Sequence, residues 1–133
     1  MPRGTRVDVL TEGVKLPFSK KKAAGYAEKI LSALGNREAR VCILFADDAG
    51  IRKLNKRYRR RDKSTDVLAF DTGDIIISAE TAARNSRDFG TTMADELKLY
   101  MIHGILHLAG YDDGSPSKRR AMRTMEEKVL RIL

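Results

Sequence analysis

Hydrophobic residues follow two spacings along the chain, and each spacing predicts one type of secondary structure. Short apolar or alternating runs bounded by glycine or polar residues are typical of β-strands. Longer stretches in which apolar residues recur every three or four positions are typical of amphipathic helices. The strands predicted in this way are residues 6–10, 39–46, 67–71 and 74–78. The predicted helices are residues 19–34, 48–59, 80–88, 94–109 and 118–133.

Residues at the ends of these segments support the boundaries. Ser19 is a typical helix N-cap, and Thr92 with Asp95 three positions later resembles a capping box. The dipeptide Thr72-Gly73 predicts a tight hairpin between the last two strands. Strands and helices are interspersed without a linker, so we expect one α+β domain over residues 1–133. A small mixed sheet of about four strands would pack with about five helices.

Two of the predicted helices have a mainly apolar side. In the helix predicted over 48–59, one side carries Ile51, Leu54, Asn55 and Tyr58. In the last predicted helix, the inward side is expected to carry Ala121, Met125, Val129 and Ile132.

Composition is that of a small protein with an aliphatic core. The chain has 133 residues, 42% of them hydrophobic, with no tryptophan. Its single cysteine, Cys42, has no partner for an internal disulfide, which fits a reducing compartment. No segment approaches the roughly 20 apolar residues that a membrane-spanning helix needs. We therefore expect a soluble, cytoplasmic protein with no membrane partner.

The charge is strongly positive and unevenly distributed. Lys and Arg number 26 against 18 Asp and Glu, for a net charge of +8. Such a surface favours phosphate-rich partners, although many small soluble proteins are simply basic. Two clusters strengthen the case for a phosphate-rich partner. The first contains Arg52, Lys53, Lys56, Arg57, Arg59, Arg60, Arg61 and Lys63, and the second contains Lys118, Arg119, Arg120 and Arg123.

The two histidines of the protein suggest a metal site. His103 and His107 lie four residues apart on the predicted 94–109 helix, so they share one face. Two imidazoles at this spacing can bind one metal ion, whereas a single histidine there would more often be an ordinary core residue. After the helix, a turn brings Asp112 and Asp113 within reach. We expect one carboxylate to make turn hydrogen bonds and the other to face the metal.

Gly104 directly follows the first histidine, where zinc peptidases with an H-E-x-x-H motif carry their general base. The glycine argues against peptide cleavage of that type. It also suggests that room remains beside the metal for a bulkier or more charged substrate.

Residues 103–112 (HGILHLAGYD) closely resemble the H-G-x-L-H-L-x-G-Y-D-H signature of the YbeY family. Two further stretches resemble the same family in the same order: 55–70 (NKRYRRRDKSTDVLAF) and 73–78 (GDIIIS). With the elements around them, the likeness spans nearly the whole chain.

The resemblance implies an α+β fold and a metal-dependent endoribonuclease that cuts single-stranded RNA. It implies a role in ribosomal RNA maturation and ribosome quality control, with ribosomal particles as partners. It leaves open a ribosomal protein or a GTPase as a protein partner. One Zn²⁺ ion would be the cofactor, held by His103, His107 and Asp113. Arg59 matches a functional arginine of the family, and its guanidinium suits phosphate contact or transition-state charge.

Other charged residues near Arg59 have less specific expected roles. Lys56 and Lys63 would join Arg59 in binding RNA, and the 118–123 cluster would add non-specific affinity. For Asp62 and Asp66, holding the loop is favoured over orienting Arg59.

Two positions depart from the family pattern. Asp113 stands where the signature has a third histidine, and Ala69 stands where the family usually has serine. Two histidines and one carboxylate form a recognised catalytic zinc set. The added negative charge should raise the pKa of metal-bound water or favour a harder cation than zinc.

Two alternatives remain open. One is a zinc metallopeptidase-like hydrolase with a His-His-Asp metal set, against which Gly104 counts. The other is a non-catalytic ribosome-binding factor with a structural metal. Structural zinc sites usually have four protein ligands, so a fourth ligand from Asp112 would favour this alternative.

Overall fold

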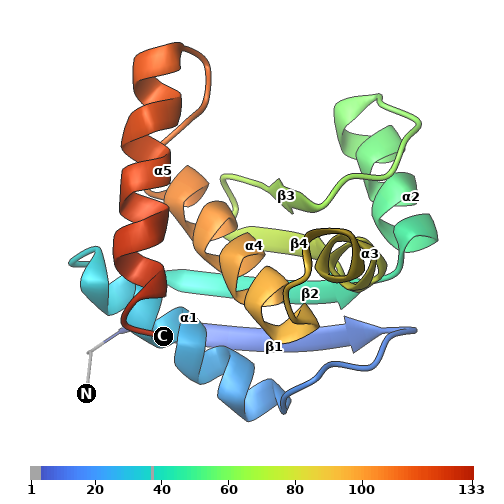
Figure 1. Ribbon diagram of the computed structural model, residues 1–133, viewed down its shortest axis with the longest axis horizontal. Helices are drawn as coiled ribbons and strands as arrows, with labels where there is room; N and C mark the ends of the chain where they lie inside the picture. The colour runs from blue at the N-terminus through green and yellow to red at the C-terminus, as the bar shows by residue number, and fades with distance from the viewer. Residues whose placement is uncertain (1–3, 37) are drawn as a thin grey trace.

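A mixed four-stranded sheet lies at the centre of the computed structural model, which describes residues 4–36 and 38–133 (Figure 1). The strands are β1 (Arg6–Glu12), β2 (Arg40–Ala46), β3 (Val67–Ala69) and β4 (Asp74–Ser78). Their order across the sheet is β1-β2-β4-β3. β1 and β2 run parallel, as do β2 and β4, whereas β3 pairs antiparallel with β4 and forms one edge.

Five helices surround the sheet, and each begins at a side chain that caps its first turn. They are α1 (Lys20–Ala33), α2 (Asp48–Arg59), α3 (Ala79–Phe89), α4 (Met93–Leu108) and α5 (Pro116–Leu130). The caps that accept a backbone N–H of the first turn are Ser19, Asp47, Ser78, Thr92 and Ser115. In the described chain, no helix is both long and apolar enough to span a membrane.

The two faces of the sheet are covered differently. Ile43, Phe45, Ile75 and Ile77 point into the main core, together with the buried faces of α1 and α4. A smaller cluster on the opposite face joins neighbouring strand residues to α2. In Figure 1, α4 crosses one face of the sheet, α5 lies beyond one end of α4, and α2 lies on the far side of β3. The edge strand β3 therefore separates α2 from the α4–α5 pair.

Gly104 lets α4 approach the sheet closely. A Cβ atom placed on Gly104 would lie 2.7 Å from Cγ2 of Ile75 and 3.4 Å from Cγ2 of Val67. Ile75 is itself fully buried. The glycine is therefore needed for helix–sheet packing, because any side chain would meet β4.

Asp48 ties the start of α2 to the junction of β4 and α3. Its Oδ1 accepts hydrogen bonds from Ser78 Oγ (2.6 Å) and Thr81 Oγ1 (2.8 Å), and its Oδ2 pairs with Arg84. Burial raises the pKa of the Asp48 carboxyl, but these hydrogen bonds outweigh burial and hold the pKa below its ordinary value. The charged form is thus the one that the fold stabilises.

The predicted fold class is confirmed: four strands in a mixed sheet and five helices form one small α+β domain. Two details differ. The β3–β4 turn has three residues between Phe70 and Asp74, because Gly73 N–H donates to Phe70 O and Gly73 adopts a φ of 93°. On α5, Val129 is buried and Met125 packs against the core as predicted, but Ala121 and Ile132 are exposed. Met122 is buried next to Ala121, so the inward face is turned by about one position at this end of the helix.

Candidate functional site

His103 and His107 lie on adjacent turns of α4 with their rings turned toward each other. Their Nε2 atoms are 3.1 Å apart, and their ring centroids are separated by 4.7 Å. Two nitrogen ligands on one tetrahedral zinc ion, each at 2.0–2.1 Å, lie about 3.3 Å apart. The pair therefore fits two adjacent positions of a tetrahedral metal site.

Glu126 of α5 fixes the orientation of His103. Its Oε2 lies 2.7 Å from His103 Nδ1, and the two side chains are 17% and 28% exposed. When the Nδ1 proton is shared with this carboxylate, Nε2 is the nitrogen that remains as a ligand. A carboxylate behind a histidine is the usual support of a metal-bound imidazole.

The two histidines are perturbed in opposite directions. The hydrogen bond to Glu126 raises the pKa of His103 above its ordinary value, although burial acts against it. Burial and the neighbouring His103 lower the pKa of His107. His107 thus favours the neutral form, which is the form that binds a metal.

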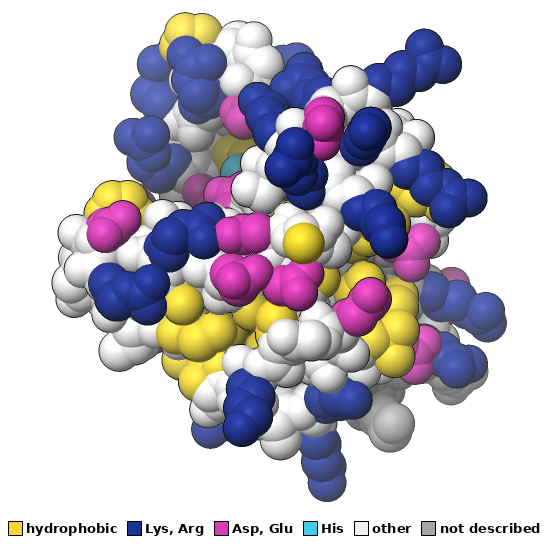
Figure 2. Space-filling view, turned by 90° about the vertical axis from the view of Figure 1, so that its right-hand side faces the viewer, with side chains coloured by type: hydrophobic (Ala, Val, Ile, Leu, Met, Phe, Trp, Pro, Cys, Tyr) yellow, Lys and Arg dark blue, Asp and Glu magenta, His cyan; other side chains and the backbone are white. Residues whose placement is uncertain are grey.

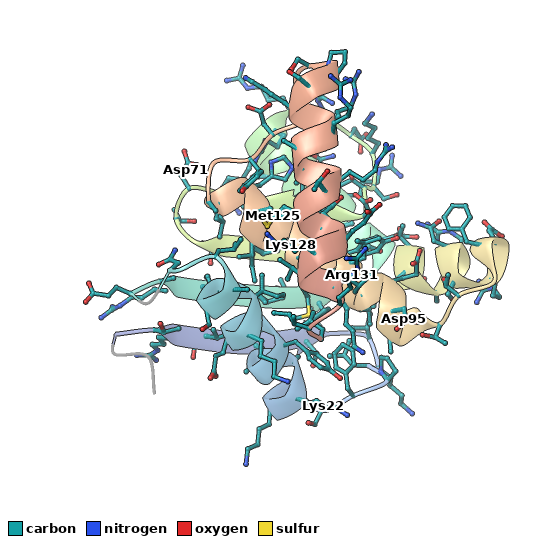
Figure 3. The ribbon with its side chains drawn as sticks, turned by 60° about the vertical axis from the view of Figure 1, so that its left-hand side comes forward. Lys22, Asp71, Asp95, Met125, Lys128 and Arg131 are labelled. Carbon is teal, nitrogen blue, oxygen red and sulfur yellow. The ribbon has the colours of Figure 1, made fainter. Side chains whose placement is uncertain are left out.

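Glu126 is a residue that sequence reasoning missed. The predicted inward face of the last helix was centred one position away, which left Glu126 off that face. With Met122 and Val129 as the buried positions, Glu126 stands out as an acidic residue on the inner side. Figure 3 shows α5 crossing α4, with Met125 near the crossing. An acidic residue between two buried positions of one helix is the sequence signal that could have identified Glu126.

Of the two carboxylates after α4, Asp112 makes the expected turn hydrogen bond, whereas Asp113 is not seen to complete a metal site. Asp112 Oδ1 accepts the backbone N–H of Gly114 at 2.9 Å, and its Oδ2 lies 3.4 Å from Lys118 Nζ. Asp113 is exposed and close enough to act electrostatically on both histidines. Within the described residues, however, no three His, Cys, Asp or Glu side chains gather closely enough to complete a metal site. Asp113 as third ligand therefore stays a prediction.

Arg59 lies at the end of α2, across the β3 edge from the histidines. Its Nη2 donates to Ala69 O at 2.6 Å, and its guanidinium carbon lies 5.0 Å from the centre of the Phe70 ring. Arg59 and His107 both border a small pocket of about 130 Å³ along β3. The fold thus brings together two side chains that are far apart in the sequence.

Neighbouring acidic residues hold the loop and do not contact Arg59. Asp62 pairs with Arg52 at 2.7 Å, and Asp66 accepts the backbone N–H of Val67 at 2.8 Å. Buried Asn55 donates to Lys63 O at 2.9 Å and so anchors the basic loop to α2. Both aspartates thus make the kind of loop contact expected of a structural role, and that role stays a prediction.

Basic side chains surround the histidines from two directions. Lys56 and Lys63 are exposed on the α2 side, and the 118–123 cluster is exposed on α5. In Figure 2, a histidine side chain is visible at the floor of a recess between two groups of Lys and Arg side chains. These flanking cations favour an anionic polymer, whereas the histidines themselves have the carboxylates of Glu126 and Asp113 nearby.

The space expected beside the metal at Gly104 is absent. Gly104 is buried, and the position of its missing Cβ is filled by Ile75 of β4. That part of the sequence interpretation is wrong, because the glycine faces the sheet and not the recess.

Comparison with known proteins decides the family. The family model described as "Endoribonuclease YbeY" matches residues 9–133. The chain belongs to the YbeY family. A YbeY endoribonuclease of Aquifex aeolicus is 38% identical over 133 residues, covering 92% of this chain and 89% of the relative. One from Bacteroides thetaiotaomicron is 35% identical over 128 residues, with 90% and 93% covered. A Thermotoga maritima protein solved in solution has a TM-score of 0.70 at 28% identity, with 93% and 86% covered. This YbeY chain thus shares both sequence and fold with its relatives.

Proposed function

We propose that this protein is a metal-dependent endoribonuclease that cuts single-stranded RNA during ribosomal RNA maturation and ribosome quality control. Two relatives named endoribonuclease YbeY match this chain over about nine-tenths of their own length. One structural observation supports the assignment most directly. His107, whose Nε2 converges on that of His103, borders the same pocket as Arg59.

The chain's own groups have distinct roles in this proposal. His103 and His107 hold the ion, Glu126 orients His103, and Asp113 is the proposed third ligand. When bound, the ion, proposed as zinc, would supply Lewis acidity, either to activate a water or to polarise a phosphoryl oxygen. Arg59 binds a phosphate oxygen and stabilises the negative charge that develops there. A guanidinium has five N–H donors, and the hydrogen bond to Ala69 O uses one of them, so the others can bind phosphate.

Substrate choice follows from the shape and charge of the recess. Exposed Lys56 and Lys63 lie near Arg59, and the α5 cluster lies opposite. These charges provide affinity for the backbone without reading sequence. Single-stranded segments suit such a surface, because their backbone can bend into a recess and their bases remain accessible.

The first test concerns the metal. Replacing both His103 and His107 by alanine should remove bound metal, measured by elemental analysis, and abolish RNA cleavage. Full retention of metal would refute the site. The Asp113→Ala variant then tests the third ligand, because a proposed ligand should lower zinc affinity when removed, measured by competition with a chromogenic chelator.

The second test concerns Arg59. Arg59→Ala should retain the circular dichroism spectrum and the bound metal while RNA cleavage falls by about 100-fold. Arg59→Lys should recover little, because lysine cannot make the bidentate contact. An unchanged rate in Arg59→Ala would remove this residue from the mechanism.

The two alternatives are less well supported. A peptidase of the H-E-x-x-H type needs a base beside His103, and that position is Gly104 packed on Ile75. A casein digestion assay beside the RNA assay separates the two. A non-catalytic ribosome-binding factor with a structural metal would cleave no RNA, and replacing its two histidines should lower the free energy of unfolding.

A further inference from the structure

Two aromatic rings lie beside Arg59 on the surface formed by α2 and β3. Tyr58 and Phe70 make an edge-to-face contact with ring centroids 5.8 Å apart. Tyr58 was expected on the same side of its helix as Ile51 and Asn55, which are both buried, yet Tyr58 is 58% exposed. One exposed ring is by itself ordinary, and Tyr58 gains meaning because a second ring lies against it.

Cationic groups accompany both rings. The guanidinium carbon of Arg59 lies 5.0 Å from the Phe70 centroid, and that of Arg57 lies 5.4 Å from the Tyr58 centroid. A continuous series of contacts therefore runs from the His107 pocket through Arg59 and Phe70 to Tyr58.

A groove extends from these rings across the face of the sheet opposite α4. Its volume is about 450 Å³, within the range of ligand-binding clefts. Its apolar lining comes from three strands and α2, because α2 covers only part of this face. The main apolar lining residues are Leu10, Leu44, Leu54, Tyr58, Phe70 and Ile76.

Charge decides which occupant suits the groove. The end formed by α2 and its following loop carries the first basic cluster, in which Arg52 is paired with Asp62 while Lys56, Arg57 and Lys63 are exposed. A second copy of this chain, itself carrying a net charge of +8, would bring like charges together there. A nucleobase with its phosphate matches both the apolar rings and the surrounding cations.

We propose that Tyr58 and Phe70 form a stacking subsite for one unpaired base of single-stranded RNA whose neighbouring phosphate is bound by Arg59. The inference rests on the proposed function and adds the position of a base to it. Stacking on an aromatic ring accepts any base, so this subsite selects unpaired over paired RNA and not one sequence over another.

The absence of tryptophan makes a direct test simple. A Tyr58→Trp variant carries a single tryptophan, placed at the proposed subsite. Its emission should be quenched in a saturable way by a single-stranded 2′-O-methyl octanucleotide. An octamer of abasic units with the same charge should give little quenching. Phe89→Trp is the matched control, because Phe89 is 69% exposed at the end of α3, outside the groove.

Affinity measurements separate stacking from charge. Tyr58→Ala should weaken octanucleotide binding by roughly 5- to 150-fold, the range expected for loss of one base–aromatic stack. Tyr58→Phe should bind the octanucleotide like the original protein. The abasic octamer should bind equally to the original protein, Tyr58→Ala and Tyr58→Phe.

Several results would overturn the subsite. These are equal quenching by the abasic octamer, unchanged affinity in Tyr58→Ala, or a change only in self-association by sedimentation. Failure of the proposed function is a separate outcome. If the original protein cuts no RNA but the Tyr58→Trp signal still requires bases, the subsite stands and the nuclease assignment falls.

Discussion

Replacing Gly104 with alanine tests the close approach of α4 to the sheet. The added Cβ would lie 2.7 Å from Ile75 Cγ2, closer than real Cβ contacts come, and Ile75 is fully buried, so the helix or the strand must shift. Overpacking of this kind costs about 1–3 kcal/mol, and the short distance places this case in the upper half. Alanine returns about 1 kcal/mol through helix propensity. The free energy of unfolding should therefore fall by about 1–2 kcal/mol.

The chain contains a matched control at Gly25, inside α1. A Cβ at Gly25 would meet no atom within 4 Å, so Gly25→Ala should raise the free energy of unfolding by about 0.5–1 kcal/mol. Urea denaturation followed by circular dichroism measures both variants. The packing argument is refuted if Gly104→Ala is as stable as the original protein, or is stabilised as Gly25→Ala is.

Three further predictions follow from individual contacts. Asp48→Asn should lower the free energy of unfolding by about 1–3 kcal/mol at pH 7 in urea denaturation. Because the folded-state pKa of Asp48 is depressed, its stabilising effect exists above the unfolded pKa and should be lost as the pH falls below about 4. A difference that persists unchanged at pH 2 would contradict this cause. Glu126→Ala should weaken zinc binding by about 10- to 100-fold, measured by chelator competition. Glu126→Gln should bind zinc more like the original protein, because its side-chain carbonyl can still accept the His103 Nδ1 proton. Equal zinc affinities in all three proteins would show that the contact does not orient the ring. Asn55→Ala, which loses the hydrogen bond to Lys63 O, should speed limited trypsin cleavage in the loop after α2, and an unchanged cleavage rate would mean that other contacts hold the loop.

Much of the architecture could be predicted from local patterns. Each strand and helix was found within a few residues, because period-2 and period-3.6 patterns and capping residues such as Ser19 and Thr92 are local signals. The length of the β3–β4 turn was harder to predict from the sequence, since it depends on which residues pair across the hairpin.

The candidate site was only partly visible in the sequence. The convergence of His103 and His107 follows from helical spacing alone. The support of Glu126 depends on how α5 rotates against α4, and the pocket shared with Arg59 depends on the sheet edge between them. The missing space at Gly104 could not be predicted either, because the sequence does not show which side of the helix meets Ile75.

The position of Glu126 on the last helix also orders events during synthesis of the chain. A ribosome makes Arg59 first, then the two histidines on α4, and α5 only at the end. A chain that stops before Pro116 would already carry the first basic cluster and both imidazoles. It would lack the carboxylate that orients His103. Such a fragment should bind nucleic acid while holding metal weakly, so full assembly of the site waits for the final helix to dock.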